Sequence, residues 1–339
     1  MANQFVIHHG TNISHWLSQS NARGAERRAR FTREDCRRLA GFGLDHLRLP
    51  VDEEQLWDED NRPEEEAWDL LLQALDWMAE DGLRAVVDLH ILRSHYFNSG
   101  SDSPLFSDPA CAERFCQCWR DLSARLGDRP VANVAYELLN EAVAADPADW
   151  NRVSRAAYDA VRALEPERTI VLGSNHWDSV YDFPFLDVPS GDPNMLLTFH
   201  YYHPMCLTHY HANWARGLEE YEGPVQYPGM SVPQEVFDTL PAKIQRGVGG
   251  HNRYACREQI EADWMWPLAV AKRTGLQLYC GEFGVHRAAP DAPAVAWYRD
   301  MRALLDAHNI AWANWDFRGA FASVDSKGNL TRAGKALFQ

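Results

Sequence analysis

Two glutamates stand directly after short apolar runs of the sequence. Glu141 comes at the end of Val134–Leu139 and Asn140, and Glu282 comes after Gln277–Cys280 and a glycine. If the two runs are buried strands, both carboxyl groups emerge at strand ends, where barrel enzymes keep their catalytic groups. A facing pair of carboxyl groups suits hydrolysis of a glycosidic bond, because one protonates the leaving oxygen while the other acts on the opposite face of the sugar.

Polar and aromatic residues stand at the ends of most of the other apolar runs. Arg48 beside Glu282 would keep that carboxylate ionised and nucleophilic. Glu141 must instead stay protonated, and burial with a nearby carboxylate would raise its pKa. Asn140 is placed to donate to a sugar hydroxyl, and Trp315 offers a flat apolar face to a pyranose ring. The residues at the ends of these other runs are Asn12, Trp16, Arg48, His90, His200, Tyr202 and Trp315.

Eight apolar runs alternate with longer amphipathic segments along the chain. Strand–helix repeats whose strands alternate poorly predict a parallel sheet covered by helices. Eight strands favour closure into a (β/α)8 barrel over an open sheet, and no glycine-rich phosphate loop follows a strand. The expected strands are Phe5–His9, Leu44–Leu49, Leu83–Leu89, Val134–Leu139, Thr169–Leu172, Met195–Phe199, Gln277–Cys280 and Ile310–Trp315.

The intervening segments carry helix signals. Asp108-Pro109 and Asp146-Pro147 each combine an N-cap residue with a proline suited to the first helical position, and Thr32 with Asp35 forms a further cap. The helices expected from periodicity are one after Thr32, then Glu64–Asp81, a helix from Asp108 to Gly127, one after Asp146, and then Glu258–Arg273, Ala294–His308 and Thr331–Phe338.

A long insert follows the sixth expected strand, at residues 201–255. Loops longer than about 15 residues are usually functional or disordered, and the tyrosines and tryptophans of this one favour a folded lid or wall of the site. No linker or low-complexity tract interrupts the chain. Residues 1–339 are therefore predicted to form one (β/α)8 domain with this insert inside it.

The motifs at the expected strand ends are similar to those of a known family. They run in order from Asn12 to Trp315, one at nearly every strand end, so the resemblance covers most of the chain. TNISHW at 11–16, HLRLP at 46–50, VVDLH at 86–90, LLNE at 138–141, HYY at 200–202, GEFG at 281–284 and NW at 314–315 resemble the landmarks of glycoside hydrolase family 5, the cellulase family of clan A.

The resemblance implies a retaining mechanism through a covalent glycosyl-enzyme, with no cofactor. It implies Glu141 as acid/base, Glu282 as nucleophile, and a hydrogen bond from Tyr202 to the nucleophile. The short sequence after strand five and the long insert after strand six depart from the family pattern, and they concern the extent of the sugar-binding cleft. The implied surrounding subsite is Arg48, His90, Asn140, His200, Tyr202 and Trp315.

The aromatic residues divide by position. The chain has 13 Trp, 12 Tyr and 14 Phe, and those on expected helices are read as core. Asp88, deeper in its strand than His90, is read as structural. Trp57, Trp68, Trp77, Trp119, Trp150, Trp264 and Trp266 belong to the core group, whereas Trp16, Trp177, Trp214 and Trp315 stand in βα-loop positions and are read as candidate sugar platforms.

Histidine-rich stretches raise the alternative of a catalytic metal. Metal-dependent barrel hydrolases place a His-x-His pair at the end of the first strand, but His8 and His9 are adjacent and face opposite sides. His209 and His211 lie in the insert. We therefore expect no metal, and most of these histidines are read as hydrogen-bonding groups.

Charge and cysteine content restrict the classes of partner. Lys and Arg number 33 against 48 Asp and Glu, a net charge of −15, which argues against nucleic acid and against an anionic membrane surface. Seven scattered cysteines do not describe a disulfide framework. No apolar stretch is long enough to span a membrane. No secretory signal is visible at the N-terminus, which favours a cytoplasmic protein or one whose signal has been removed.

The sequence thus predicts a retaining β-glycosidase that acts on a β-linked glucan or related oligosaccharide, with endo-β-1,4-glucanase activity as the default. The alternatives are an exo-acting β-glucosidase or β-mannosidase, or a β-mannanase, on short oligosaccharides or glycosides. A carbohydrate-binding barrel without catalysis would lack one of the two glutamates, and both are present. A metal-dependent hydrolase would lose activity with a chelator.

Overall fold

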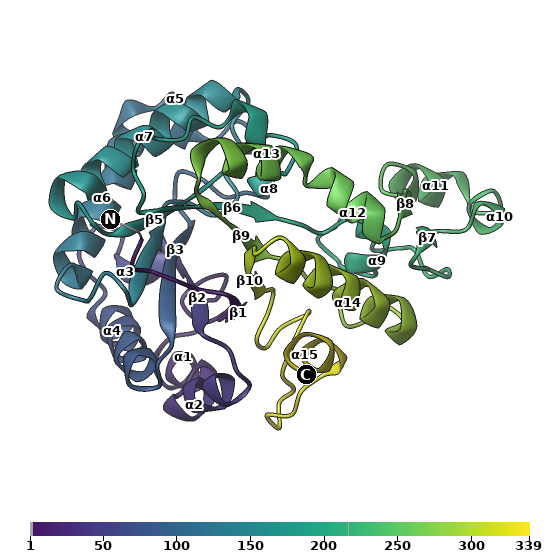
Figure 1. Cartoon of the computed structure of the whole chain (residues 1–339), viewed down its shortest axis with the longest axis horizontal. Coiled ribbons are helices and arrows are strands. Elements are labelled where there is room, and N and C mark those ends of the chain that lie inside the picture. The colour runs from purple at the N-terminus through teal and green to yellow at the C-terminus, as the bar shows by residue number, and fades with distance from the viewer. Residues whose placement is uncertain (1–2, 216) are drawn as a thin grey trace.

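Eight parallel strands close into a barrel in this computed structural model, which describes residues 3–215 and 217–339. Around the barrel the strands follow the order β1-β10-β9-β6-β5-β4-β3-β2 (Figure 1). The predicted (β/α)8 fold is confirmed. The strands are β1 (His9–Asn12), β2 (His46–Asp52), β3 (Arg84–Ile91), β4 (Val134–Glu137), β5 (Thr169–Gly173), β6 (Met195–His200), β9 (Gln277–Glu282) and β10 (Ala311–Asn314).

The barrel strands are buried on both faces, which explains their continuous apolar character. All seven residues of β2 are buried, although Arg48 and Asp52 have ionisable side chains. One cluster of apolar side chains fills the barrel interior, and a larger one lies between the strands and the helices. The interior cluster consists of Phe5, Ile7, Val86, Ala135, Val171, Leu196, Tyr279, Ala311 and Ala313.

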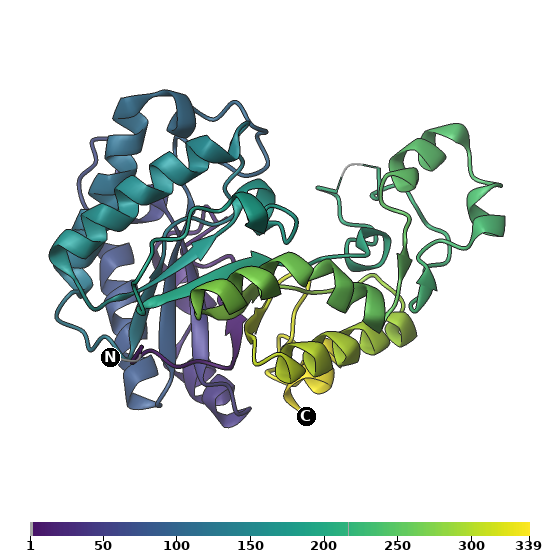
Figure 2. The same ribbon diagram turned by 45° about the horizontal axis from the view of Figure 1, so that its top comes forward.

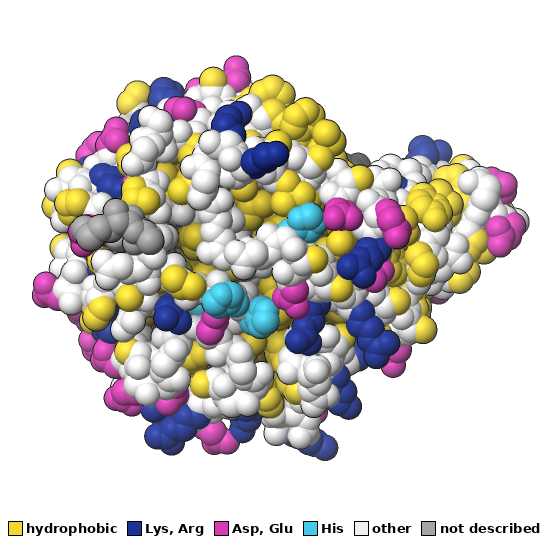
Figure 3. All heavy atoms as spheres, in the orientation of Figure 1, with side chains coloured by type: hydrophobic (Ala, Val, Ile, Leu, Met, Phe, Trp, Pro, Cys, Tyr) yellow, Lys and Arg dark blue, Asp and Glu magenta, His cyan; other side chains and the backbone are white. Residues whose placement is uncertain are grey.

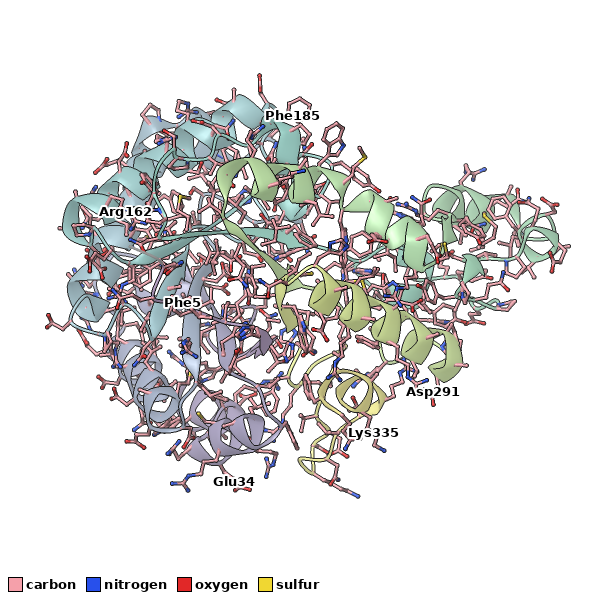
Figure 4. All side chains as sticks on the ribbon, in the orientation of Figure 1. Phe5, Glu34, Arg162, Phe185, Asp291 and Lys335 are labelled. Carbon is pink, nitrogen blue, oxygen red and sulfur yellow. The ribbon has the colours of Figure 1, made fainter. Side chains whose placement is uncertain are left out.

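The first expected strand is wrong in its position. Phe5 and Ile7 are at most 1% exposed, but the segment that holds them runs across the barrel before β1 begins at His9 (Figure 1). Figure 4 shows Phe5 within the ring formed by the strands. Alternating apolar residues are typical of a strand, yet here they close one end of the barrel. The true first strand, HGTN, is too short and too polar for its pattern to reveal it.

Helices surround the barrel and begin at the predicted caps. Thr32 and Asp35 form a capping box, and the side chains of Asp108 and Asp146 accept from backbone N–H groups two residues on. The helices beside the barrel are α1 (Gly24–Arg30), α2 (Arg33–Gly41), α3 (Glu53–Leu56), α4 (Glu65–Glu80), α5 (Pro104–Ser107), α6 (Pro109–Leu126), α7 (Pro147–Leu164), α8 (Asn175–Asp178), η1 (Phe183–Phe185), α12 (Arg257–Asp263), α13 (Met265–Thr274), α14 (Asp291–Ala307) and α15 (Arg332–Phe338).

Two expectations about the helix layer are wrong in detail. The helix expected over Glu258–Arg273 is divided at Trp264 into α12 and α13, because Pro267 falls in the first turn of the second helix and cannot lie within a longer one. Trp266 is 42% exposed and is not a core residue. The other six helix tryptophans read as core are buried or partly buried against the core.

The insert at residues 201–255 begins beside the site and then projects away from the barrel. It contains α9 (Met205–Thr208), α10 (Gln234–Phe237), α11 (Ala242–Gly249) and the antiparallel pair β7 (Gly229–Met230) with β8 (Tyr254–Ala255). Figures 1 and 2 show α10 and α11 far from the strands, whereas α9 lies close to them. Its first residues therefore have the better position to act on a substrate.

The surface charges, the cysteines and the helix lengths give further information on the class of protein. On the face in Figure 3, Lys and Arg side chains are interspersed with Asp and Glu. All seven cysteines are free thiols. Among the described residues, no helix has both the length and the apolar character needed to cross a membrane.

Candidate active site

Arg48 lies at the centre of the group of side chains that the strand ends bring together. Its side chain is fully buried. The guanidinium donates through Nε and Nη2 to both oxygens of Glu137, at 2.8 and 3.0 Å, and through Nη1 to Glu282 at 2.8 Å. Asn12 and Asn140 each accept a further hydrogen bond at 2.9 Å. A guanidinium presents donors in a fixed fork, so this network fixes the direction of every group that it contacts.

Glu282 is held from two sides at the end of β9. Arg48 contacts Oε1, and the Tyr202 hydroxyl donates to Oε2 at 2.9 Å. Both contacts agree with what the sequence predicts for this carboxyl group. Burial raises the pKa of Glu282, while the nearby His200 and Arg48 oppose that rise. Arg48 thus favours the ionised form, as expected, but it acts against the cost of burial rather than alone.

Glu141 follows β4 in a different environment. Its oxygen Oε1 lies 3.0 Å from Nδ1 of His200, and no Lys or Arg among the described residues contacts it. Burial raises the pKa of Glu141 to about 7, and Glu137 contributes in the same direction. This direction matches the expectation for a group that must hold a proton. Its backbone φ of 46° lies in the left-handed region, which costs a non-glycine residue roughly 1–2 kcal/mol.

The two predicted glutamates meet at His200. One carboxyl oxygen of Glu141, one of Glu282 and a ring nitrogen of His200 all lie within 4.8 Å of one another. Burial lowers the pKa of His200 to about 4, so the imidazole is neutral near pH 7. A neutral ring adds no charge between the carboxyl groups and fixes the position of Glu141 through one nitrogen.

His90 and Trp315 form one side of the site. Their rings stack with centroids 5.5 Å apart and an interplanar angle of 4°. Nδ1 of His90 lies 2.8 Å from Asp88, whose other contact is Arg48 at 3.0 Å. Burial lowers the pKa of His90 to about 3. Asp88 is fully buried beneath these residues, in agreement with its structural interpretation.

Asn140 directs its two amide atoms differently. Oδ1 accepts from Arg48, whereas Nδ2 has no protein partner among the described residues and is buried. A buried amide donor without a partner costs free energy unless a ligand or water accepts from it. Nδ2 is therefore a candidate donor to a ligand, and the predicted contact with a sugar hydroxyl stays a prediction.

The four loop tryptophans are not equivalent. Trp16 is 1% exposed and packs against Phe31, so its predicted role as a sugar platform is wrong. The whole indole of Trp16 is used in packing, so no face of the ring is left for a sugar. Trp177 and Trp214 are 46% and 49% exposed, and Trp315 is 8% exposed. Trp177 keeps its position by donating from Nε1 to the Phe97 carbonyl at 3.0 Å.

The comparison with protein families identifies this arrangement. The model of the cellulase family, glycosyl hydrolase family 5, matches residues 10–320. The chain belongs to glycoside hydrolase family 5. The match includes every strand of the barrel except the first residue of β1 and contains all the site residues above. The protein is a glycoside hydrolase, and its resemblance to the family is confirmed.

Relatives and solved structures agree with the family assignment. Endoglucanase C of Acetivibrio thermocellus is 30% identical over 313 residues, which cover 91% of this chain and 90% of that protein. Cellodextrinase A of Ruminococcus flavefaciens is 28% identical over 305 residues, which cover 89% of this chain and 83% of that protein. Thermotoga maritima Cel5A, in complex with cellobiose, has the same fold with a TM-score of 0.78, 21% identity, and coverage of 98% and 96%.

Two buried acids of this family 5 chain were missed by the sequence analysis. Glu137 accepts hydrogen bonds from Arg48 with both of its carboxyl oxygens, and Asp178 accepts one from the backbone N–H of Glu141 at 3.0 Å. A signal existed for each. Glu137 interrupts the apolar run of β4, and Asp178 follows β5, the strand to whose end no function was assigned.

The same acids bear on the question of a metal. Two groups have ligand atoms close enough to share an ion, Glu137 with Asp178 and His200, and Glu141 with His200 and Glu282. Arg48 already contacts Glu137 and Glu282, so a divalent cation in either group would lie beside a guanidinium. The donor set fits a proton-transfer site better than a metal centre, because like charges repel in a buried site.

Proposed function

We propose that this family 5 enzyme is a retaining β-glucan hydrolase that resembles an endo-β-1,4-glucanase. The observation that carries the proposal is the approach of the two carboxyl groups, whose nearer oxygens lie within 4.8 Å. Carboxyl groups about 5–5.5 Å apart are typical of retaining enzymes, whereas inverting enzymes leave about 6.5–9.5 Å for a water molecule. The short separation favours direct attack by one carboxylate.

In the first step, Glu282 attacks the anomeric carbon as a carboxylate. Glu141 gives its proton to the glycosidic oxygen as the bond to the leaving sugar breaks, which yields a covalent glycosyl-enzyme. The higher pKa that burial gives Glu141 supplies the proton near neutral pH. Arg48 and Tyr202 hold the attacking carboxylate in place.

In the second step, Glu141 acts as a base. It takes a proton from water, and the water oxygen attacks the anomeric carbon and releases Glu282. We expect the N–H of Asn140 to bind a sugar hydroxyl in both steps, because its Nδ2 has no protein partner among the described residues. All proton transfers in this scheme use side chains of the chain itself, so a chelator should leave the rate unchanged.

The substrate class rests on the relatives. Endoglucanase C and Cellodextrinase A support β-1,4-linked glucose polymers or their short fragments. A second candidate is activity on β-mannans. It is supported by a structure of Thermotoga maritima Cel5A, which has the same fold and is described in complex with mannotriose. The exposed Trp177 and Trp214 offer platforms for sugars beyond the reacting ring.

A product profile tests the proposal. The enzyme is incubated with cello-, manno- and laminari-oligosaccharides, and the products are followed by chromatography and by NMR of the anomeric protons. We expect cello-oligosaccharides to be cut internally with initial release of the β-anomer. Initial release of the α-anomer would contradict the retaining mechanism, and stepwise loss of single sugars would replace the endo assignment by an exo one.

A further inference from the structure

A short turn after β5 is bonded to the loop that carries Glu141. Asn175 pairs with both the N–H and the carbonyl of Ala144, at 2.8 and 2.9 Å. The N–H of Trp177 donates to the carbonyl of Ala142 at 3.2 Å, and Asp178 accepts from the N–H of Glu141 at 3.0 Å. These four hydrogen bonds connect two loops that are adjacent in the barrel but separate in the sequence.

The Asp178 side chain occupies a space that a glycine leaves open. A Cβ atom added to Gly173 would lie 1.7 Å from Oδ1 of Asp178, which is closer than any real contact. Asp178 is itself fully buried, and Oδ1 has no partner among the described residues. The glycine at the end of β5 is therefore required for the carboxyl group to reach the Glu141 backbone.

The peptide units on either side of Glu141 are held from two directions. Asp178 accepts from the N–H, and Nε2 of His95 lies 3.3 Å from the carbonyl oxygen. Glu141 has a left-handed φ of 46°, which an unrestrained glutamate rarely adopts. Loss of the Asp178 contact would allow the backbone to relax and turn the carboxyl group away from its present direction.

Charged and titratable groups from three strands face Asp178. Glu137 and Glu141 approach from β4 and the loop after it, His200 from β6 with Nε2 at 3.6 Å, and Arg48 from β2. Burial raises the pKa of Asp178 well above its ordinary value, and Glu137 adds to that rise. A protonated Asp178 accepts the hydrogen bond without placing a further negative charge beside Glu141.

We propose that Asp178 is a positioning residue for the acid/base, and that its carboxyl group, in the space left by Gly173, fixes the backbone from which Glu141 reaches the leaving oxygen. The inference rests on the proposed function, in which Glu141 is the general acid. Asp178 acts through Glu141, since its side chain is fully buried and is bonded to the Glu141 N–H.

The test separates positioning of the acid from a general loss of structure. Activity is measured on two substrates with the same sugar, one with a sugar as leaving group and one with dinitrophenolate, which leaves without a proton. Asp178→Ala should lose about 10- to 100-fold in kcat/KM on the first substrate, because a small misplacement of a catalytic group costs that much. It should lose less than about threefold on the second, where proton donation contributes little.

Two variants control for folding and for charge. Asp178→Asn keeps an oxygen that accepts from the Glu141 N–H, so it should retain the wild-type ratio of the two activities within about threefold. Asp187→Ala removes an exposed carboxylate from the same connection between β5 and β6, and it should leave both activities unchanged. Thermal melts of all variants establish that each protein is folded.

The outcomes distinguish this inference from the proposed function. Glu141→Ala, measured with the same substrates, must itself show the leaving-group dependence, and its failure would remove the acid/base assignment and this inference with it. If Glu141→Ala shows the dependence but Asp178→Ala loses both activities equally, only the positioning role is wrong. An Asp178→Asn variant as defective as Asp178→Ala would also overturn that role.

Discussion

Glu282 and Glu141 approach the same histidine, but the side chains around them differ in charge and in hydrogen bonding. Glu282 contacts a guanidinium and a hydroxyl, both of which donate to its oxygens. Glu141 contacts a neutral imidazole, and its backbone is held by a buried acid whose pKa is raised. Donors that favour a carboxylate surround one glutamate, and burial beside further carboxyl groups favours the protonated form of the other.

The difference shows how a barrel gives two residues of one type different surroundings. Within residues 3–215 and 217–339, Arg48 is the only Lys or Arg side chain that contacts the buried acids Asp88, Glu137 and Glu282. One positive charge cannot neutralise every carboxyl group in the site, so some of them must hold a proton near neutral pH. Burial raises the pKa of Glu141 to about 7 and that of Asp178 well above its ordinary value, and neither has a direct contact with Arg48 among the described residues. Burial also raises the pKa of Asp88 to about 7, although Arg48 contacts it and opposes the rise.

The largest effect is expected at Glu282, the proposed nucleophile. Glu282→Ala should reduce kcat by at least about 10⁴-fold, as removal of a covalent catalyst does, without loss of the fold. Azide added to this variant should enter the vacated face and give the α-glycosyl azide, detected by NMR. The matching Glu141→Ala variant should give the β-glycosyl azide through the intact intermediate, and identical products from both variants would abolish the distinction between the two sites.

The next effect concerns the proton on Glu141. The protonated form is active in the first step, so kcat/KM should fall about tenfold per pH unit above the pKa of about 7. Glu141→Gln should lose about 10²- to 10⁴-fold on oligosaccharides and should no longer show this fall. The measurement is a pH–rate profile of both proteins, and an unchanged alkaline limb in the variant would assign the titration to another group.

Replacement of Arg48 should disturb the Glu282 side more than the Glu141 side. Arg48→Lys keeps the charge but cannot donate to Glu137, Asn12 and Glu282 together, so we expect about a 10²-fold loss in kcat. The alkaline limb assigned to Glu141 should stay within about one pH unit, since Arg48 does not contact that residue directly. Kinetics over the pH range test this, and equal shifts of both limbs would show that the two environments are not separate.

The smallest effects belong to the exposed tryptophans. Trp177 lies on the turn bonded to the Glu141 loop, whereas Trp214 packs beside Phe321, which contacts the Tyr202 ring. Trp177→Ala and Trp214→Ala should each raise KM about 3- to 10-fold, from the loss of about 0.5–1.5 kcal/mol of stacking. Different shifts in the cleavage pattern of cellohexaose are expected, and Trp16→Phe, a buried control, should leave the pattern unchanged.

The fold followed from pattern because most barrel strands are buried on both faces and leave continuous apolar runs. β2, β3, β6 and β9 lie close to their expected bounds, and the caps at Asp108 and Asp146 are in place. The prediction of the first strand was wrong because an apolar pattern reports burial and does not identify a strand. Phe5 and Ile7 have the alternation of a strand but close the barrel end, while HGTN forms β1 through hydrogen bonds that any backbone provides.

The candidate site could be predicted at positions where a charged or polar residue type at a strand end has few structural roles other than a place in the site. Glu141, Glu282, Arg48 and Tyr202 come together as expected, and both predicted contacts of Glu282 are present. The prediction for Trp16 was wrong because an indole in a loop suits packing and ligand binding equally well. Only the atoms around it decide which of the two roles it has. The insert at 201–255 as a lid and the single-domain organisation stay predictions.

The order of amino acids alone determined the fold class, the two carboxyl groups and the side chains that meet them, since these depend on residue type and on periodicity along the chain. The tertiary structure decided how burial and neighbouring charges shift the pKa of each acid, and which stretch of backbone is held by hydrogen bonds. Asp178 shows the reason: its hydrogen bond to the Glu141 N–H depends on a glycine at the end of β5 and joins two residues that are 37 positions apart. Burial and contact between distant segments are properties of the folded chain, and no local pattern encodes them.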